Sequence, residues 1–254
     1  KAKIIAASDS AFHSTIPDYI RKYSLPDSDT SKHDIYRFGY HGLSVSSVMG
    51  RIHAVTGMCS KRTIVCHIGS GVSVTAVKEE KSFDTSMGYS PGSGLIMGSR
   101  AGDLDGGALL ALMQTKNLKP IDAQTYIQTH GGLFGLSGMI DLRLLLEKRI
   151  HGDSVATRAI DSFVYQIQKT IGGYVAGLGG VDLLVFTATA SERSSTLRAL
   201  ITKELSFLGV ELDVEKNELC VSRDGVISSV GSAVKVAVIK TDESSEMLKI
   251  SKEV

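Results

Sequence analysis

A glycine-rich segment at residues 83–107, FDTSMGYSPGSGLIMGSRAGDLDGG, constrains the fold of this chain more than any other feature. It contains seven glycines, three aspartates and one arginine, Arg100. Glycine loses more conformational freedom on folding than any other residue, and long irregular segments in compact domains are commonly functional. The segment is therefore interpreted either as a long surface loop or as a segment whose backbone lies against an anionic ligand.

Apolar patterns on both sides of this segment predict strands and helices in a mixed order. Strands are expected at residues 3–8, 62–67, 72–77, 82–85, 182–187 and 234–239, the last being a strand or a buried helix. Helices are expected at residues 44–55, 105–114, 120–130, 140–148, 154–178, 192–208 and 243–250, with Ser44 as the N-cap of the first. A strand meander combined with later crossovers predicts a mixed α/β architecture around one main sheet.

Composition narrows the class of function. The net charge is +1, so the chain has no electrostatic field for nucleic acid or for an anionic membrane. Trp is absent and no apolar run reaches about 18 residues, so neither a base-stacking platform nor a membrane span is expected. The cysteines Cys59, Cys66 and Cys220 show no CxxC spacing, which predicts reduced thiols, no zinc site and a cytoplasmic location.

Four polar positions lie next to predicted strands or turns. Asp9 could cap a turn, bind Mg²⁺ through water or act as a base. His41 lies between glycines and aromatic residues, where a structural role is the more common one. The HIGSG run at residues 67–71 is either a tight hairpin or a nest of N–H groups that faces an anion. Arg100 could bind carboxylate or phosphoryl oxygens, or pair with a nearby aspartate.

Taken together, the motifs of this chain resemble those of the acetate kinases (acetokinases), of which propionate kinase is a close relative. In chain order they are SDSAFHSTIP, FGYHGLS, CHIGSG, KSFDTSMGYSP, LIMGSRAGDLD and DLLVFTA. The resemblance implies a ribonuclease-H-like α/β fold of the actin/Hsp70/sugar-kinase superfamily, with a mixed sheet flanked by helices. It also implies a homodimeric enzyme that transfers a phosphoryl group between ATP and a short carboxylate such as acetate, with Mg²⁺.

The resemblance assigns roles to individual positions. Asp9 would lie near the metal and the substrate, His41 would contact the transferring phosphoryl group, and Arg100 would stabilise the transition state. Glu243 would be the second metal-binding residue. The positions that would bind phosphate or nucleotide are His67, Gly69, Ser70, Gly71, Asp141, Arg143, Thr189, Ala190, Ser191, Glu192 and Arg193.

One departure from the family pattern concerns the adenosine loop. The family reads approximately FTAGIGENS there, whereas residues 186–194 of this chain read FTATASERS. Side chains at Thr189, Ser191 and Arg193 are expected to enter the space of the purine and ribose, because a glycine lets a ligand approach the backbone closely. This departure keeps pyrophosphate open as an alternative to ATP as the phosphoryl donor.

A second departure concerns the beginning of the family pattern. The family starts with a strand that carries an Asn-x-Gly-Ser-Ser-Ser motif, and this chain starts just before Asp9. The resemblance therefore predicts that residues 1–240 form a ribonuclease-H-like catalytic domain and that residues 241–254 return to a missing N-terminal domain. The isolated chain is expected to be inactive, and a non-catalytic remnant is the alternative function from another class.

Overall fold

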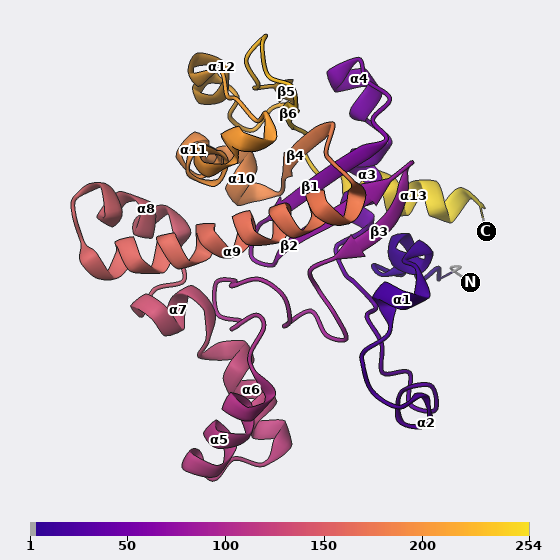
Figure 1. Ribbon diagram of the computed structural model, residues 1–254, viewed down its shortest axis with the longest axis vertical. Coiled ribbons are helices and arrows are strands. Elements are labelled where there is room, and N and C mark those ends of the chain that lie inside the picture. The colour runs from indigo at the N-terminus through magenta and orange to yellow at the C-terminus, as the bar shows by residue number, and fades with distance from the viewer. Residues whose placement is uncertain (1–3, 254) are drawn as a thin grey trace.

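The computed structural model describes residues 4–253, in which one mixed sheet lies between helices on both faces (Figure 1). The order of the strands across the sheet is β3-β2-β1-β4-β6-β5. Their bounds are β1 (Arg62–Ile68), β2 (Val72–Lys78), β3 (Lys81–Thr85), β4 (Leu183–Thr187), β5 (Gly225–Val226) and β6 (Lys235–Val238).

Strand β1 connects the two halves of this sheet. It pairs antiparallel with β2 and parallel with β4, while β2 pairs antiparallel with β3 and β4 pairs parallel with β6. The meander and the later crossovers predicted from the sequence are thus confirmed. Because β1 and β4 are parallel, the loops that follow them both lie at the carboxyl ends of the strands. Open α/β sheets commonly bind ligands there.

The helices cover both faces of the sheet and extend beyond it. The long α9 crosses one face, while α3 and α13 lie on the other (Figure 1). The bounds of the helices are η1 (Ala11–Thr15), α1 (Asp18–Arg21), α2 (Asp27–Thr30), α3 (Gly42–Met49), α4 (Ile52–Thr56), α5 (Gly106–Lys116), α6 (Pro120–Thr129), α7 (Gly132–Ser137), α8 (Leu142–Ile150), α9 (Ser154–Leu178), α10 (Thr189–Arg193), α11 (Ser195–Thr202), η2 (Lys203–Leu208), α12 (Val214–Leu219) and α13 (Glu243–Glu253).

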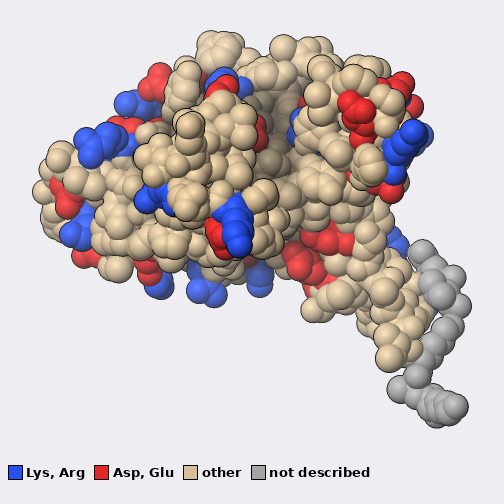
Figure 2. Space-filling model, turned by 90° about the horizontal axis from the view of Figure 1, so that it is seen from below, with Lys and Arg blue, Asp and Glu red and all other residues tan. Residues whose placement is uncertain are grey.

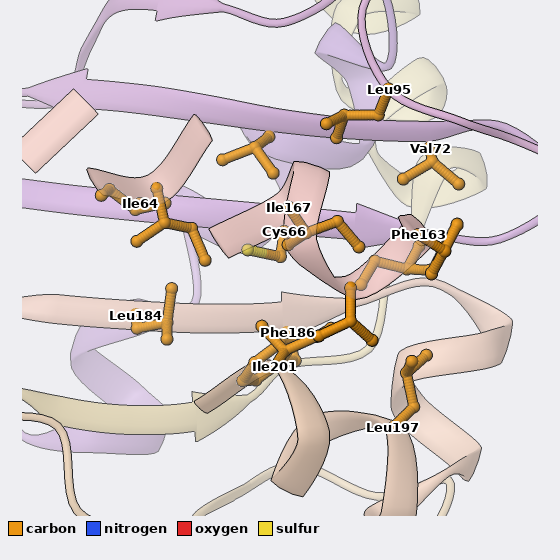
Figure 3. Close-up of a cluster of buried hydrophobic side chains, with 14 of the residues drawn as sticks. Ile64, Cys66, Val72, Leu95, Phe163, Ile167, Leu184, Phe186, Leu197 and Ile201 are labelled. Carbon is orange, nitrogen blue, oxygen red and sulfur yellow. The ribbon is translucent and has the colours of Figure 1, made fainter. Parts of the chain in front are cut away.

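Two apolar layers, one on each face of the sheet, form the core. Successive side chains of a strand point to opposite faces, so Ile64 and Cys66 of β1 face α9, whereas Val65 faces α3. Figure 3 shows Phe163 and Ile167 of α9 packed among the strand residues of the first layer. Burial on both faces explains the uninterrupted apolar run Ile64-Val65-Cys66 in the middle of β1.

Some predicted elements differ from the structure. Residues 4–8 form no strand, and Lys3 lies outside the described residues. Ile4 is 93% exposed, because no neighbouring strand of the described chain covers this segment. The helix expected at residues 44–55 is divided into α3 and α4. The helix expected at residues 192–208 is divided into α10, α11 and η2, since the side chain of Ser194 caps a new helix there.

A helical lobe of α5 and α6 extends away from the sheet (Figure 1). None of the residues of α5 is buried, although its sequence, GGALLALMQTK, is largely apolar. Leu110 of α5 and Ile121 of α6 are 67% and 66% exposed. The lobe therefore presents an apolar surface that this chain alone does not cover.

The outer surface carries acidic and basic side chains that are spread over the face shown in Figure 2, in line with the net charge of +1. Within residues 4–253, no helix has the length and apolarity that a membrane span requires. The proposed boundary at residue 240 stays a prediction. In this structure α13 packs against α3, and the Ser46 hydroxyl donates to Glu246 at 2.6 Å.

Candidate functional site

The hairpin between β1 and β2 forms the centre of the candidate site. The N–H of Gly69 donates to the carbonyl oxygen of Gly71 at 2.9 Å, so the HIGSG run is a tight hairpin, as one of its two interpretations held. A Cβ atom on Gly71 would lie 2.7 Å from Nε2 of His41 and 3.7 Å from Nη1 of Arg100. Only glycine leaves room at this position, and the two candidate catalytic side chains therefore meet at the hairpin.

Asp9 fixes the backbone that carries His41. Its two carboxylate oxygens accept the N–H groups of His41 at 2.8 Å and Leu43 at 3.2 Å, at the beginning of α3. His41 is the N-cap residue and has a φ of 61°, a conformation that non-glycine residues adopt only when the surroundings hold it. The prediction that Ser44 caps this helix is therefore wrong, because Asp9 supplies the capping oxygens across 32 positions of the sequence.

The ring of His41 is held from two sides. Its Nδ1 makes a hydrogen bond to Oγ of Ser73 at 2.9 Å, and the ring stacks on His67 with centroids 3.9 Å apart. Nδ1 of His67 makes an equivalent bond to Oγ of Ser44 at 2.8 Å. The sequence pattern predicted a different role for Ser44, that of a helix cap, and did not single out Ser73. The signal for Ser73 was its place among polar residues that alternate with apolar ones along a strand buried on both faces.

Both imidazoles are neutral near physiological pH. Burial lowers the pKa of His41 to about 4, the charge of Asp9 opposes this change, and Arg100 adds to it. Burial also lowers the pKa of His67 well below the ordinary value, with a further contribution from His41. A neutral ring whose Nδ1 accepts from a serine carries its proton on Nε2 and can donate there.

Arg100 points toward the same hairpin. Its Nη1 donates to the carbonyl oxygen of Pro91 at 3.0 Å, which orients the guanidinium group. The alternative salt bridge to a nearby aspartate is not present among the described residues. Asp103 instead accepts the N–H of Gly94, and Asp105 caps α5.

The glycines of the segment at residues 83–107 bring parts of its own backbone together. Gly102 has a φ of 76°, and a Cβ atom there would lie 2.6 Å from the carbonyl oxygen of Gly94. Gly94 has a φ of 88° and would place a Cβ atom 2.3 Å from the carbonyl oxygen of Ser86. The need for glycine at positions 94 and 102 is thus explained by close packing inside the loop that carries Arg100, rather than by contact with a ligand.

The loop after β4 contains the substitutions that set this chain apart. Ser191 is fully buried and its hydroxyl donates to the carbonyl oxygen of Thr187 at 2.5 Å. The expectation that Ser191 enters the purine space is therefore wrong, because its side chain turns inward onto β4. Thr189 and Arg193 do line a cavity. Ala188 has φ 70° and ψ 161°, a region that is essentially limited to glycine and that costs about 1–3 kcal/mol.

Two cavities meet at the hairpin. The larger, of about 790 Å³, lies between α8, α10 and the Arg100 loop, and its wall includes the apolar side chains of Ile140, Leu142 and Phe163. The smaller, of about 430 Å³, lies between His41, the β4–α10 loop and residues 241–244. Gly69, Ser70 and Thr189 line both cavities, so the hairpin stands between them.

Asp141 and Arg143 form one wall of the larger cavity. Asp141 caps α8 by accepting the N–H of Arg143, and the two side chains form an ion pair with an N–O distance of 2.6 Å. The hydrogen bonds from Arg143 hold the pKa of Asp141 at about 2. This wall is thus charged and preorganised, although the guanidinium group remains largely exposed.

Glu243 lines the smaller cavity, and Asp9 lies near enough for its charge to act on the Glu243 carboxyl. Burial raises the pKa of the Glu243 carboxyl, and the negative charge of Asp9 raises it further. Within residues 4–253, no cluster of three or more His, Cys, Asp or Glu side chains has a metal-binding arrangement. Mg²⁺ commonly uses only one or two carboxylates together with water and substrate phosphates, so the donor chemistry of Asp9 and Glu243 suits that ion.

The sequence relationships agree with this geometry. The family model described as the acetokinase family matches residues 1–249. The chain belongs to the acetokinase family. An acetate kinase of Flavobacterium johnsoniae is 38% identical over 246 residues, which make up 97% of this chain and 62% of that relative. The chain thus spans less than two thirds of the length of this acetokinase.

Solved structures of the acetokinase family share the fold. The crystal structure of acetate kinase from Porphyromonas gingivalis matches 96% of this chain and 62% of its own, with a TM-score of 0.92 at 36% identity. A propionate kinase from Francisella tularensis matches 94% of this chain and 61% of its own, with a TM-score of 0.88 at 33% identity. The ribonuclease-H-like fold of the actin/Hsp70/sugar-kinase superfamily, predicted from the sequence, is confirmed.

A pH dependence of stability follows from the buried His67. Its folded-state pKa is lower than its unfolded-state pKa, so the unfolded chain binds more protons as the pH falls below about 6.5, and stability decreases. We expect the free energy of unfolding of His67→Gln to fall less steeply than that of the unmodified chain between about pH 7 and pH 5. Urea denaturation at each pH measures this slope. His53→Gln, at an exposed position, is the control, and equal slopes in all three proteins would contradict the prediction.

Proposed function

We propose that this chain carries the nucleotide site and the phosphoryl-transfer residues of an acetate kinase, which forms an acyl phosphate reversibly from ATP and acetate or propionate. The convergence of His41 and Arg100 on Gly71, where the two cavities meet, carries this proposal. A non-catalytic remnant is the other function considered. The ordered arrangement of Asp9, His41 and Arg100 around one hairpin favours the enzyme.

The side chains present suit phosphoryl transfer. A carboxylate substrate is already ionised at neutral pH, so the reaction needs positioning and charge stabilisation more than a general base. The planar guanidinium group of Arg100 would bind equatorial oxygens of the transferring group. Nε2 of His41 would contact the same group, because Ser73 occupies Nδ1, and it would donate in the tautomer whose Nδ1 accepts from Ser73. The N–H groups of Ser70 and Gly71 would face the neighbouring phosphate, since the N–H of Gly69 already donates to Gly71.

The cavities favour ATP over pyrophosphate as the donor. The larger one, of about 790 Å³, has an apolar wall and a charged rim, which suits a nucleoside better than a bare inorganic anion. The inward position of Ser191 leaves this space open. Asp141, Arg143, Thr189, Ala190 and Arg193 would line the nucleotide in this proposal.

Asp9 and Glu243 would hold Mg²⁺ at the smaller cavity. The bound ion would offset the negative charge of the substrate phosphates. The carboxylate of Asp9 is held in place by this chain itself, because both of its oxygens also accept N–H groups at the beginning of α3. The cytoplasmic location stays a prediction that rests on the free cysteines.

We also propose that the chain forms a homodimer through the α5–α6 lobe. Helix α5 has no buried residue, and exposed large apolar side chains such as Leu110 and Ile121 suit an interface core better than contact with water.

The role of Arg100 is tested by substitution in the protein expressed from its complete reading frame. We expect Arg100→Ala to lower kcat for acyl-phosphate formation by roughly 10²–10³, as for other charge-stabilising donors. Arg100→Lys should restore little, because the planar fork is lost. Arg158→Ala, at an exposed position of α9, is the matched control. A change confined to KM would contradict the assigned role.

The donor is tested by calorimetric titration of the chain with ADP, adenosine and pyrophosphate. We expect ADP to bind most tightly, because it fills the apolar cavity and also reaches the hairpin. Adenosine should bind more weakly than ADP, and pyrophosphate more weakly still. Tight binding of pyrophosphate without binding of ADP would support the pyrophosphate-linked alternative instead.

The dimer is tested by sedimentation. We expect the unmodified chain to sediment as a dimer and Leu110→Glu/Ile121→Glu to sediment as a monomer, because each buried charge would lack a partner. Val230→Glu, at a position that is 98% exposed, serves as the control and should remain dimeric. A monomeric unmodified chain would contradict this proposal.

A further inference from the structure

The carboxylate of Glu192 does not point into the nucleotide cavity. Glu192 is only 8% exposed, and none of its atoms lines either cavity of the site. Its Oε1 accepts the N–H of Ala188 at 2.8 Å and the N–H of Thr241 at 3.0 Å. One buried oxygen atom thus joins two segments that are far apart in sequence.

Both segments line the smaller cavity. Ala188 and Thr189 form one wall, and residues 241–244, including Glu243, form the other. Thr241 lies between β6 and α13, so its position sets where Glu243 and the final helix begin. The position of these two walls relative to each other is therefore held by hydrogen bonds to Glu192.

Ala188 needs such support because of its backbone conformation. Its φ of 70° and ψ of 161° fall in a region that a side chain disfavours, and such residues persist only where the surroundings determine them. Glu192 lies one helical turn beyond Ala188, and its own N–H returns to the carbonyl oxygen of Ala188 at 2.9 Å. Both polar backbone groups of Ala188 are thus bound by Glu192.

We propose that Glu192 is a positioning residue that holds the β4–α10 loop and the segment carrying Glu243 in the arrangement that binds nucleotide. This inference rests on the proposed nucleotide-binding function of the cleft. It changes the role expected from the sequence, where Glu192 was a nucleotide contact. Glu192 acts instead through Ala188 and Thr241. Because the same oxygen atom accepts hydrogen bonds from both residues, a movement of one wall affects the other.

The first test uses amide hydrogen exchange in the chain without ligand. In Glu192→Ala, the amides of Ala188 and Thr241 should lose protection together. In Glu192→Gln, protection should be partly retained, because the amide oxygen still accepts but is a weaker acceptor than a carboxylate. Glu246→Gln is the matched control, since the Glu246 side chain binds Ser46 and Lys249 rather than the β4–α10 loop, and Ala188 should stay protected there.

The second test measures ADP binding with Mg²⁺ by titration. The apparent dissociation constant should rise about tenfold or more in Glu192→Ala, because only the fraction of molecules with both walls in place binds. It should rise less in Glu192→Gln and stay unchanged in Glu246→Gln. A purely structural role of Glu192 would lower stability in the two Glu192 variants without this graded loss of affinity.

Two results would overturn the inference. One is protection of Ala188 or Thr241 that is unchanged in both Glu192 variants, and the other is ADP affinity that is unchanged although protection is lost. If the unmodified chain binds no ADP, the nucleotide proposal itself fails, and the exchange data alone then decide whether Glu192 couples the two walls. Should Glu192→Ala not fold, the Glu192→Gln comparison carries both measurements.

Discussion

The pairing of β1 with β2 on one side and β4 on the other is the constraint on which the site depends. The antiparallel partner returns through the HIGSG hairpin, and the parallel partner leads into the β4–α10 loop. Because His67 lies opposite both Ser73 and Thr187 in register, the two loops leave the sheet side by side. Any slip of one residue would turn His67 to the wrong face of the sheet.

Polar side chains at the junction of α3 with the sheet then fix the chemistry. Asp9 holds the first turn of α3, and this places the His41 ring over Gly71 and against His67. Both histidines are kept neutral by burial, with serine partners on Nδ1 that set which nitrogen can face a ligand. As a result, Nε2 of His41 and the guanidinium group of Arg100 are both directed at Gly71.

Several features of the site could be predicted from the sequence. The motifs around Asp9, His41, Gly71 and Arg100 indicated the family, and the fold follows from that relationship. The actual contacts could not be predicted, because they join residues distant in sequence. Asp9 replaced Ser44 as the cap of α3, since capping depends on which oxygen reaches the free N–H groups in space rather than on the adjacent residue.

The adenosine loop shows the same division. The sequence by itself determined that side chains replace two glycines at Thr189 and Ser191, and it determined the alternating strand pattern and the long apolar face of α9. Only the tertiary structure decided that Ser191 turns inward and that Glu192 binds two backbone segments instead of a ligand. Local sequence sets which conformations a residue can adopt, whereas the direction of a side chain depends on hydrogen-bond partners that folding brings from elsewhere in the chain.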